Sequence, residues 1–482
     1  MERLTSAEGE SSQDGGRQEP RVRSRRRVAG VSTPTLAAAR LTLPGVMDAE
    51  GRVDESRLRM HIFQNGGVSP TERGLAWRFL FGMYPCSSTA LERPLLQEQL
   101  AVRYKVMKAK WQNVVPSAVR MHLNGTDGKN AKRSLSLSER RKLILISTVY
   151  RLCSAAELVA ALGYFNQRQE LVQQQASNLS EDVRDRVTFL ELQAQILFER
   201  ATFDQAELQE AIRIINKDVP RTNRDLSYYQ GEGSGNLLVL RDILITYAAF
   251  HPEVSYAQGM NDLCSRFLEV MDCEVDSFWS FSCFMEKFAK DFREDGLHRK
   301  IELEAALLKE LDPQLHVHLV TDSMESFTFC HRWLLLGFQR EFEYSDALRL
   351  FEILSCDHLE FISQQVDRAR YQERLAQKYC TDDECELQAV NTDFTFELFI
   401  CAAILLDHRD ALLQCQDEVQ LIQFTSSLQG TLDLNSTLKK AEHHFFNYCK
   451  RCAWDSVNCR CRAHKSKEED FLYQLRSLFV LR

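Results

Sequence analysis

An arginine and a glutamine in two separate loops are the residues of this chain best suited to carry chemistry. Arg221 ends the segment Ile215–Arg221, in which a Pro-bounded loop follows an apolar helical stretch. Gln258 stands beside a glycine in Tyr256–Met260, between two stretches with helical spacing. GTP hydrolysis on a small GTPase uses such a pair, because a guanidinium offsets the charge developing on the phosphates and an amide orients the attacking water. Lysine would serve less well, since it lacks the planar fork that engages two oxygens together.

The flanks of both residues, with a third motif upstream, resemble the TBC domain of Rab GTPase-activating proteins. The family patterns are R-x-x-x-W, I-x-x-D-x-x-R and Y-x-Q-G-M, and they occur here in the family's order. They are matched by Arg73 and Trp77; by Ile215, Asp218 and Arg221; and by Tyr256, Gln258, Gly259 and Met260. The resemblance extends from about residue 58 to 448, apart from one segment. Phe351 stands where family members often carry Trp, a departure that we expect to affect packing and not chemistry.

The resemblance implies an all-α, multi-helix domain of two helical lobes that acts on a Rab-family small GTPase in its GTP-bound form. In that family the arginine and the glutamine are supplied in trans, which assigns catalysis to Arg221 and Gln258. Asp218 would orient the arginine. No cofactor of the chain's own is implied, because the partner brings GTP and magnesium. The process served would be vesicle and membrane trafficking.

The remaining motif residues are expected to support the two loops. Tyr256 and Met260 should pack the glutamine loop, and Gly259 should let the backbone approach the partner closely. Two interpretations of the upstream motif stay open. Trp77 would be a core residue beside a solvated or salt-bridged Arg73, or Arg73 would contact the GTPase directly. Ser69 is expected to cap the helix that carries both.

Two other functional classes remain as alternatives. One is a catalytically silent TBC adaptor that binds a small GTPase or trafficking machinery without accelerating hydrolysis. Inactive members of the family commonly lack the motif arginine, the motif glutamine or both, and this chain has both. The other is a purely structural helical scaffold, which gives no reason for three motifs to occur together. Residues 41–84 look nearest to family members associated with autophagic and endosomal traffic.

Composition limits the class of partner and the compartment. The 482 residues include 60 basic and 68 acidic side chains, a net charge of −8, which argues against a nucleic-acid-binding protein. The 15 cysteines mostly lie in apolar helical segments, as is typical of reduced thiols. We expect no secretory signal, and the apolar run Leu143–Tyr150 is too short to span a bilayer. A cytoplasmic protein is expected, with recruitment to endosomal or autophagosomal membranes.

The chain is expected to divide into three parts. Residues 1–42 are rich in Ser, Gly and Arg and lack a hydrophobic period, which predicts disorder. Their arginines form either a solvated tail or a peripheral contact with an acidic membrane surface. Residues 43–448 form the TBC domain, with an insertion at about 124–207. Residues 449–482 form a Cys-rich tail.

Two further motifs suggest chemistry that we do not expect to find. The tail contains Cys449-x-x-Cys452, then Cys459, Cys461 and His464, but the second pair is too closely spaced for a common zinc module. A metal-free tail is predicted, with lipidation or redox chemistry as lesser alternatives. The glycine-rich segment 231–235 follows no strand and lacks a Gly-Lys-Ser/Thr sequence, so it is predicted to be a flexible turn and not a phosphate-binding loop.

Overall fold

The computed structural model describes residues 41–42, 45–114, 167, 180–292, 294–320, 327–357, 359–360 and 393–454. Within these ranges the chain forms helices joined by loops, and extended backbone pairs only in one isolated bridge between Met47 and Val53. The all-α prediction is confirmed. No helix in the described part of the chain is long and apolar enough to cross a bilayer. Most of the segment predicted to be disordered, much of the predicted insertion and nearly all of the Cys-rich tail lie outside these ranges.

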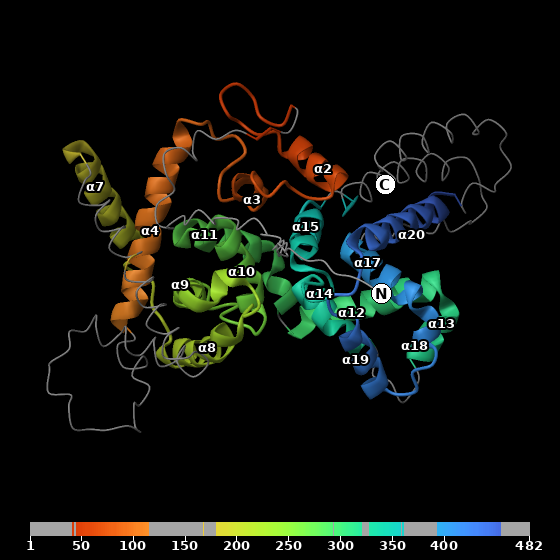
Figure 1. Ribbon diagram of the computed structural model, residues 1–482. Coiled ribbons are helices and arrows are strands. Elements are labelled where there is room, and N and C mark those ends of the chain that lie inside the picture. Colours follow the sequence, from red (N-terminus) through yellow and green to blue (C-terminus); the bar gives the residue numbers. More distant parts are fainter. Residues whose placement is uncertain are drawn as a thin grey trace, which may run out of the picture.

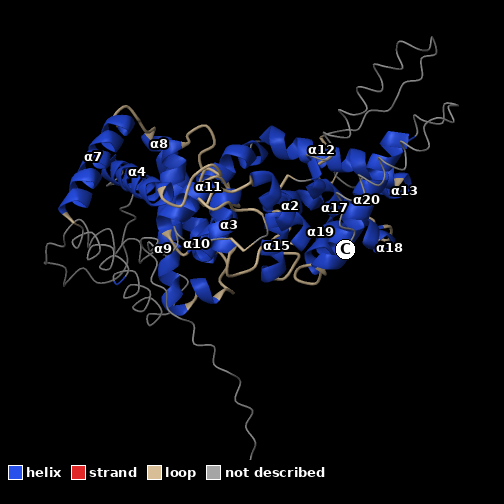
Figure 2. Ribbon diagram, turned by 90° about the horizontal axis from the view of Figure 1, so that it is seen from above, coloured by secondary structure: helices blue, strands red, loops and turns tan. Residues whose placement is uncertain are grey.

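The helices divide into two lobes that lie side by side (Figures 1 and 2). The first lobe contains α3 (Arg73–Leu80), α4 (Glu92–Val114), α7 (Glu181–Phe198), α8 (Gln205–Asp218), α9 (Gly235–Phe250), α10 (Met260–Met271) and α11 (Glu274–Phe288). The second lobe contains α12 (Glu294–Leu311), α13 (Pro313–Leu319), α14 (His331–Leu336), α17 (Phe396–Asp407), α18 (Arg409–Leu412), α19 (Glu418–Ser427) and α20 (Leu434–Trp454). Five 3₁₀ turns connect them: η1 (Val219–Arg221), η2 (Ser227–Tyr229), η3 (Gly231–Ser234), η4 (Ala289–Phe292) and η5 (Thr328–Cys330).

Two helices belong to both lobes, α2 (Glu55–Asn65) and α15 (Tyr344–Leu354). On α15, Leu348 and Phe351 enter the core of the first lobe, while Leu350 and Ile353 enter the core of the second. The residues alternate because neighbouring positions on a helix point about 100° apart. A helix that is apolar on two faces therefore joins the cores. Phe351 is buried there and stacks on Phe81, with ring centroids 5.4 Å apart.

The Arg73/Trp77 motif belongs to this junction. Glu352 of α15 accepts hydrogen bonds from Arg73 Nε at 2.6 Å and from Trp77 Nε1 at 2.7 Å, both on Oε1. Its Oε2 accepts from the Val68 amide at 2.7 Å. Arg73 is 9% exposed and Trp77 is fully buried. These contacts match the first of the two interpretations, a core Trp77 beside a salt-bridged Arg73, because the guanidinium and the indole are engaged inside the fold.

Several element boundaries differ from those expected. Ser69 does not cap α3; it lies in a turn, donates from its hydroxyl to Glu72 Oε2 at 3.1 Å, and the helix begins at Arg73. The boundary at 448/449 falls inside α20, and Cys449 is buried in the second lobe. Residues 205–207, placed at the end of the insertion, are the first turn of α8.

The α7 helix lies within the predicted insertion and runs along α4 at the outer edge of the first lobe (Figure 1). Lys105 of α4 pairs with Glu191 of α7 at 2.5 Å, and Glu98 pairs with Arg186 at 2.8 Å. The opposite face of α7 exposes four large apolar side chains, namely Phe189, Leu192, Ile196 and Leu197. In the chain it precedes α8, the helix that leads into the Arg221 loop, and it packs mainly on α4.

Candidate functional site

The arginine loop is shaped by the end of α8. Asp204 caps the start of this helix by accepting from the amides of Ala206 and Glu207. At its other end the helix tightens into η1, in which Pro220 has no N–H to continue the helical pattern. Arg221 emerges from this turn with its side chain 60% exposed. Its Nη2 donates to Oδ1 of the buried Asp218 at 2.6 Å, so the carboxylate holds one nitrogen of the guanidinium while most of the side chain stays in solvent.

The glutamine loop leads into α10 through a left-handed residue. Gly259 has φ +102° and is the N-cap of α10, a conformation that L side chains rarely adopt. A Cβ at this position would lie 3.1 Å from Leu336 Cδ2 of the second lobe. Gly259 thus makes a close approach to the chain's own α14. Gln258, immediately before it, is exposed, and its side chain makes no hydrogen bond to the described residues.

One hydroxyl joins the two loops. The Tyr256 hydroxyl lies 2.9 Å from Asp218 Oδ2 and 3.0 Å from Asn261 Oδ1, and its single proton is donated to one of them at a time. Asn261 Nδ2 donates to Thr222 Oγ1 at 2.9 Å, and Asn261 Oδ1 accepts from the Gly259 amide at 3.3 Å. Tyr256 and Asn261, on either side of Gln258, are thus bonded to Asp218 and Thr222, on either side of Arg221.

Burial makes this network stiff. Burial raises the pKa of the Tyr256 hydroxyl far above its usual range, and the neighbouring Asp218 carboxylate raises it further. The tyrosine therefore stays protonated and keeps donating at any physiological pH. Asn223 and Ser255 take positive φ values of 43° and 56°, and such backbone persists only where the surroundings fix it. Asn223 is fixed by donating from Nδ2 to Ser265 Oγ at 2.7 Å.

The structure brings most of the predicted residues together. Ile215 and Met260 are fully buried beneath the loops, Asp218 and Tyr256 are buried between them, and Arg221 and Gln258 are exposed above. Arg73 and Trp77 lie in the core instead. Sequence analysis missed the bridging roles of Thr222 and Asn261, whose polarity beside each motif was the only signal. It also missed Glu352, a single acid in the apolar run 350–354, which is the pattern of a buried partner for a cation.

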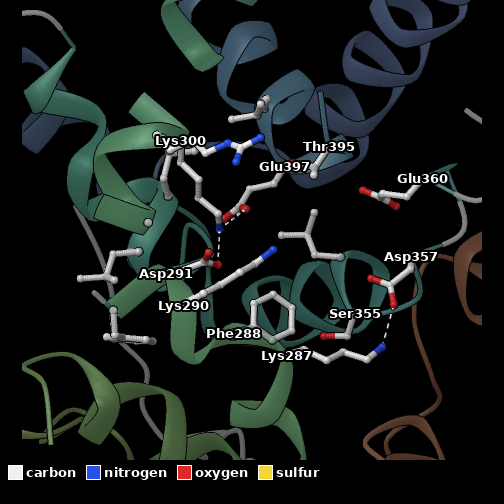
Figure 3. Close-up of a pocket in the computed structure, with 18 of the residues that line it drawn as sticks. Lys287, Phe288, Lys290, Asp291, Lys300, Ser355, Asp357, Glu360, Thr395 and Glu397 are labelled. Carbon is white, nitrogen blue, oxygen red and sulfur yellow. Dashed lines mark hydrogen bonds and ion pairs between the residues drawn. The ribbon is translucent and has the colours of Figure 1, made fainter. Parts of the chain in front are cut away.

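A cavity of about 780 Å³ lies between the lobes (Figure 3). Lys287 pairs with Asp357 on one side of it, and Lys300 pairs with Asp291 and Glu397 on another. Its lining residues include Phe292 and Leu335, which are also the neighbours of Gly259. The cavity therefore reaches the back of the glutamine loop. No group of three or more His, Cys, Asp or Glu side chains in the described ranges could hold a metal ion.

The chain matches the family model described as the Rab-GTPase-TBC domain over residues 148–366. This match contains both loops of the site. Over this segment the chain is similar to the TBC-domain family. The match begins inside the segment 124–207 that we expected to be an insertion, and it leaves Arg73 and Trp77 upstream.

Known relatives extend the similarity. The chain is 30% identical to human TBC1 domain family member 17 over 308 residues, which cover 63% of this chain and 35% of that protein. It is 26% identical to the GTPase-activating protein GYP7 of Yarrowia lipolytica over 410 residues, 83% of this chain and 42% of that protein. The chain thus spans less than half the length of each relative. The crystal structure of the Ypt/Rab-GAP domain of Gyp1p aligns with 84% of this chain and 95% of its own, at a TM-score of 0.46 and 16% identity.

Proposed function

We propose that this chain accelerates GTP hydrolysis on a Rab-type small GTPase by supplying Arg221 and Gln258 in trans. The observation that carries the proposal is the bonded pair Asp218–Tyr256, which joins the two loops whose exposed side chains are of the required types. The similarity to the family and the printed name of the yeast relative support the same activity. The GTP-bound form of the GTPase is the partner, and it brings the nucleotide and magnesium.

In this proposal the two side chains have different tasks. The exposed guanidinium of Arg221 offsets the charge that develops on the phosphate oxygens as the bond to the leaving phosphate breaks. The Gln258 amide accepts a hydrogen bond from the attacking water and orients it. Asp218 keeps the arginine extended, and Tyr256 keeps the glutamine loop at a fixed distance from it. An arginine supplied in trans contributes about 10³–10⁵ in rate for related reactions.

A GTP-hydrolysis screen tests the activity. The purified chain is incubated with a panel of Rab proteins loaded with GTP, and the single-turnover rate is measured. Activation of at least one Rab is expected, and Arg221→Ala and Arg221→Lys should each lose most of it while unfolding at the wild-type temperature, because the residue lies in an exposed loop. Arg213→Ala, an exposed arginine paired with Glu210 on the same helix, is the matched control. Binding of a Rab without acceleration would identify the chain as a silent adaptor.

Location forms a separate part of the proposal. We infer a cytoplasmic protein that is recruited to endosomal or autophagosomal membranes, with the arginines of residues 1–42 as the contact with acidic lipid. Sedimentation with vesicles containing phosphatidylserine, compared between the full chain and a chain without these residues, tests this contact.

A further inference from the structure

Hydrogen bonds join the second lobe to the first next to the loops that carry Arg221 and Gln258. Arg266 of α10 is fully buried and donates to Gln339 Oε1 at 3.0 Å and to the Leu336 carbonyl at 2.8 Å. Gln339 Nε2 in turn lies 3.5 Å from Asn223 Oδ1 in the arginine loop. Gly259 of the glutamine loop rests on the side chain of Leu336. Both loops therefore contact the segment 336–339 of the other lobe.

The next residue of this segment, Arg340, makes an ion pair across the junction. Its Nη2 lies 3.2 Å from Oδ2 of Asp262, which is in the first turn of α10. The backbone of Arg340 is fixed in the second lobe, because its carbonyl accepts from the Gly430 amide at 3.0 Å. Its side chain is 53% exposed, whereas that of Asp262 is 9% exposed. The pair thus joins a surface cation to a nearly buried carboxylate four residues after Gln258.

Asp262 depends on this cation. Burial raises the pKa of Asp262, and Arg340 is the largest of the influences that lower it, followed by Arg266; Asp218 acts in the opposite direction. The Tyr256 hydroxyl is a further titratable group that interacts with it. A nearly buried carboxylate is costly unless it is paired. Since Asp262 also accepts from Asn261 Nδ2 at 3.3 Å, any movement of Asp262 passes to the residue that bridges the loops.

We propose that Arg340 is a positioning residue for the glutamine loop: by pairing with Asp262 it holds the first turn of α10 against the second lobe and so sets the place of Gln258. The N-cap of α10 is Gly259, which has no side chain to fix this turn. Among the described residues its amide donates to Asn261 Oδ1. The ion pair therefore supplies the restraint that a capping side chain supplies elsewhere. This inference rests on the proposed activation of a GTPase.

A double-mutant cycle in single-turnover GTP hydrolysis tests it. Arg340→Ala, Asp262→Asn and the double variant are compared on the Rab that the wild-type chain activates best. We expect Arg340→Ala to lower the maximal rate roughly three- to tenfold with little change in the half-saturating concentration of the chain. The double variant should be no worse than Arg340→Ala, because each change removes the same pair. Arg340→Lys, which keeps a cation, should recover most of the rate.

Arg409→Ala is the matched control, since Arg409 pairs with Asp312 at 2.6 Å in the second lobe, away from the loops. Losses that add in the double variant, or an Arg340→Ala effect confined to the half-saturating concentration, would overturn the inference and point to direct contact between Arg340 and the GTPase. Amide hydrogen exchange of residues 256–261 gives a readout independent of activity. Faster exchange is expected in Arg340→Ala, and unchanged exchange would reject the positioning role even if no Rab responds to the wild-type chain.

Discussion

Asp218 and Tyr256 are 38 positions apart in the sequence, yet the tyrosine hydroxyl lies 2.9 Å from Oδ2 of the carboxylate. The other oxygen of the same carboxylate accepts from Arg221 at 2.6 Å. One buried acid therefore orients the arginine and anchors the loop that carries the glutamine. Arg221 and the loop that carries Gln258 are thus coupled through Asp218.

Removal of the Tyr256 hydroxyl should separate the effect of loop coupling on Rab activation from its effect on stability. Tyr256→Phe is expected to lower Rab activation about tenfold and to cost about 1 kcal/mol of unfolding free energy, because one buried hydrogen bond is lost while the ring still packs. Urea unfolding and single-turnover hydrolysis measure the two quantities. Tyr84→Phe is the matched control: its buried hydroxyl donates to Gln97 Oε1 at 2.9 Å, far from both loops. Equal loss of activation in both variants would contradict a specific role for Tyr256.

The buried Glu352 should be a determinant of stability and not of chemistry. Glu352→Leu leaves the Arg73 guanidinium inside the fold without its carboxylate, a change that typically costs about 3–5 kcal/mol. The double variant Arg73→Met/Glu352→Leu should be more stable than Glu352→Leu, because no unpaired charge then remains buried. Urea unfolding of both variants checks this order. A stable Glu352→Leu chain that binds its Rab poorly would restore the view of Arg73 as a GTPase contact.

Glu360 should make the stability of the second lobe depend on pH. Its Oε1 accepts from the Phe396 amide at the start of α17 at 2.8 Å, and burial raises the pKa of its carboxyl to about 7. The unfolded chain releases this proton near pH 4.3. Between the two values the native state binds more protons, so the contribution of Glu360 to stability falls as pH rises from about 4.5 to 7 and stays low above 7.

Glu360→Gln keeps the acceptor and removes the charge. The variant should therefore be more stable than the wild type by about 1–3 kcal/mol at pH 8, and the difference should vanish toward pH 5. Thermal unfolding at several pH values measures it. Glu92→Gln is the contrasting control, since hydrogen bonds from Thr89 lower the pKa of Glu92 and its neutral variant should gain nothing at high pH. A pH-independent difference for Glu360→Gln would contradict the argument.

The helical class and the loop positions of Arg221 and Gln258 could be predicted from local patterns, and the two lobes from the resemblance to the TBC family. Helical periodicity identifies apolar faces, and the motif spacing places Arg221 and Gln258 at loop positions. The Asp218–Tyr256 bond could not be predicted in this way, because it joins residues that only the packing of α8, α9 and α10 brings together. The pairing of Arg340 with Asp262 is more distant still, since it crosses between lobes.

The two interpretations of Arg73 and Trp77 stayed open for a related reason. Their spacing of four places them on one helical face, which is equally compatible with a core and a surface. Only the position of Glu352, 275 residues beyond Trp77, decides between these, because it turns the arginine inward. The close approach of Gly259 to a partner stays a prediction. The neighbour of Gly259 is Leu336 of the same chain, a contact that depends on how the lobes are placed.

Gln258 offers a test that separates activation with two supplied side chains from activation with the arginine alone. If Gln258 orients the water, the GTPase's own glutamine is partly redundant, and a Rab in which that glutamine is changed to Leu should still respond measurably to this chain. Gln258→Ala should then be strongly impaired on the wild-type Rab. Because Gln258 is exposed and makes no hydrogen bond to the described residues, the variant should unfold at the wild-type temperature. Gln230→Ala, an exposed glutamine on the loop after η2, is the matched control.

The opposite pattern has an equally clear meaning. If Gln258 only packs the loop, the glutamine variant of the Rab stays unresponsive while Gln258→Ala keeps its activity. Single-turnover hydrolysis with both proteins in both forms gives four rates, and their pattern decides. The expected pattern is that loss of the Rab glutamine is tolerated, loss of Gln258 is not, and loss of both reduces the rate further, because no amide is then left to hold the water in line with the phosphate. This order is expected because the bond between Tyr256 and Asp218 joins the loop of the exposed amide to the loop of the exposed guanidinium.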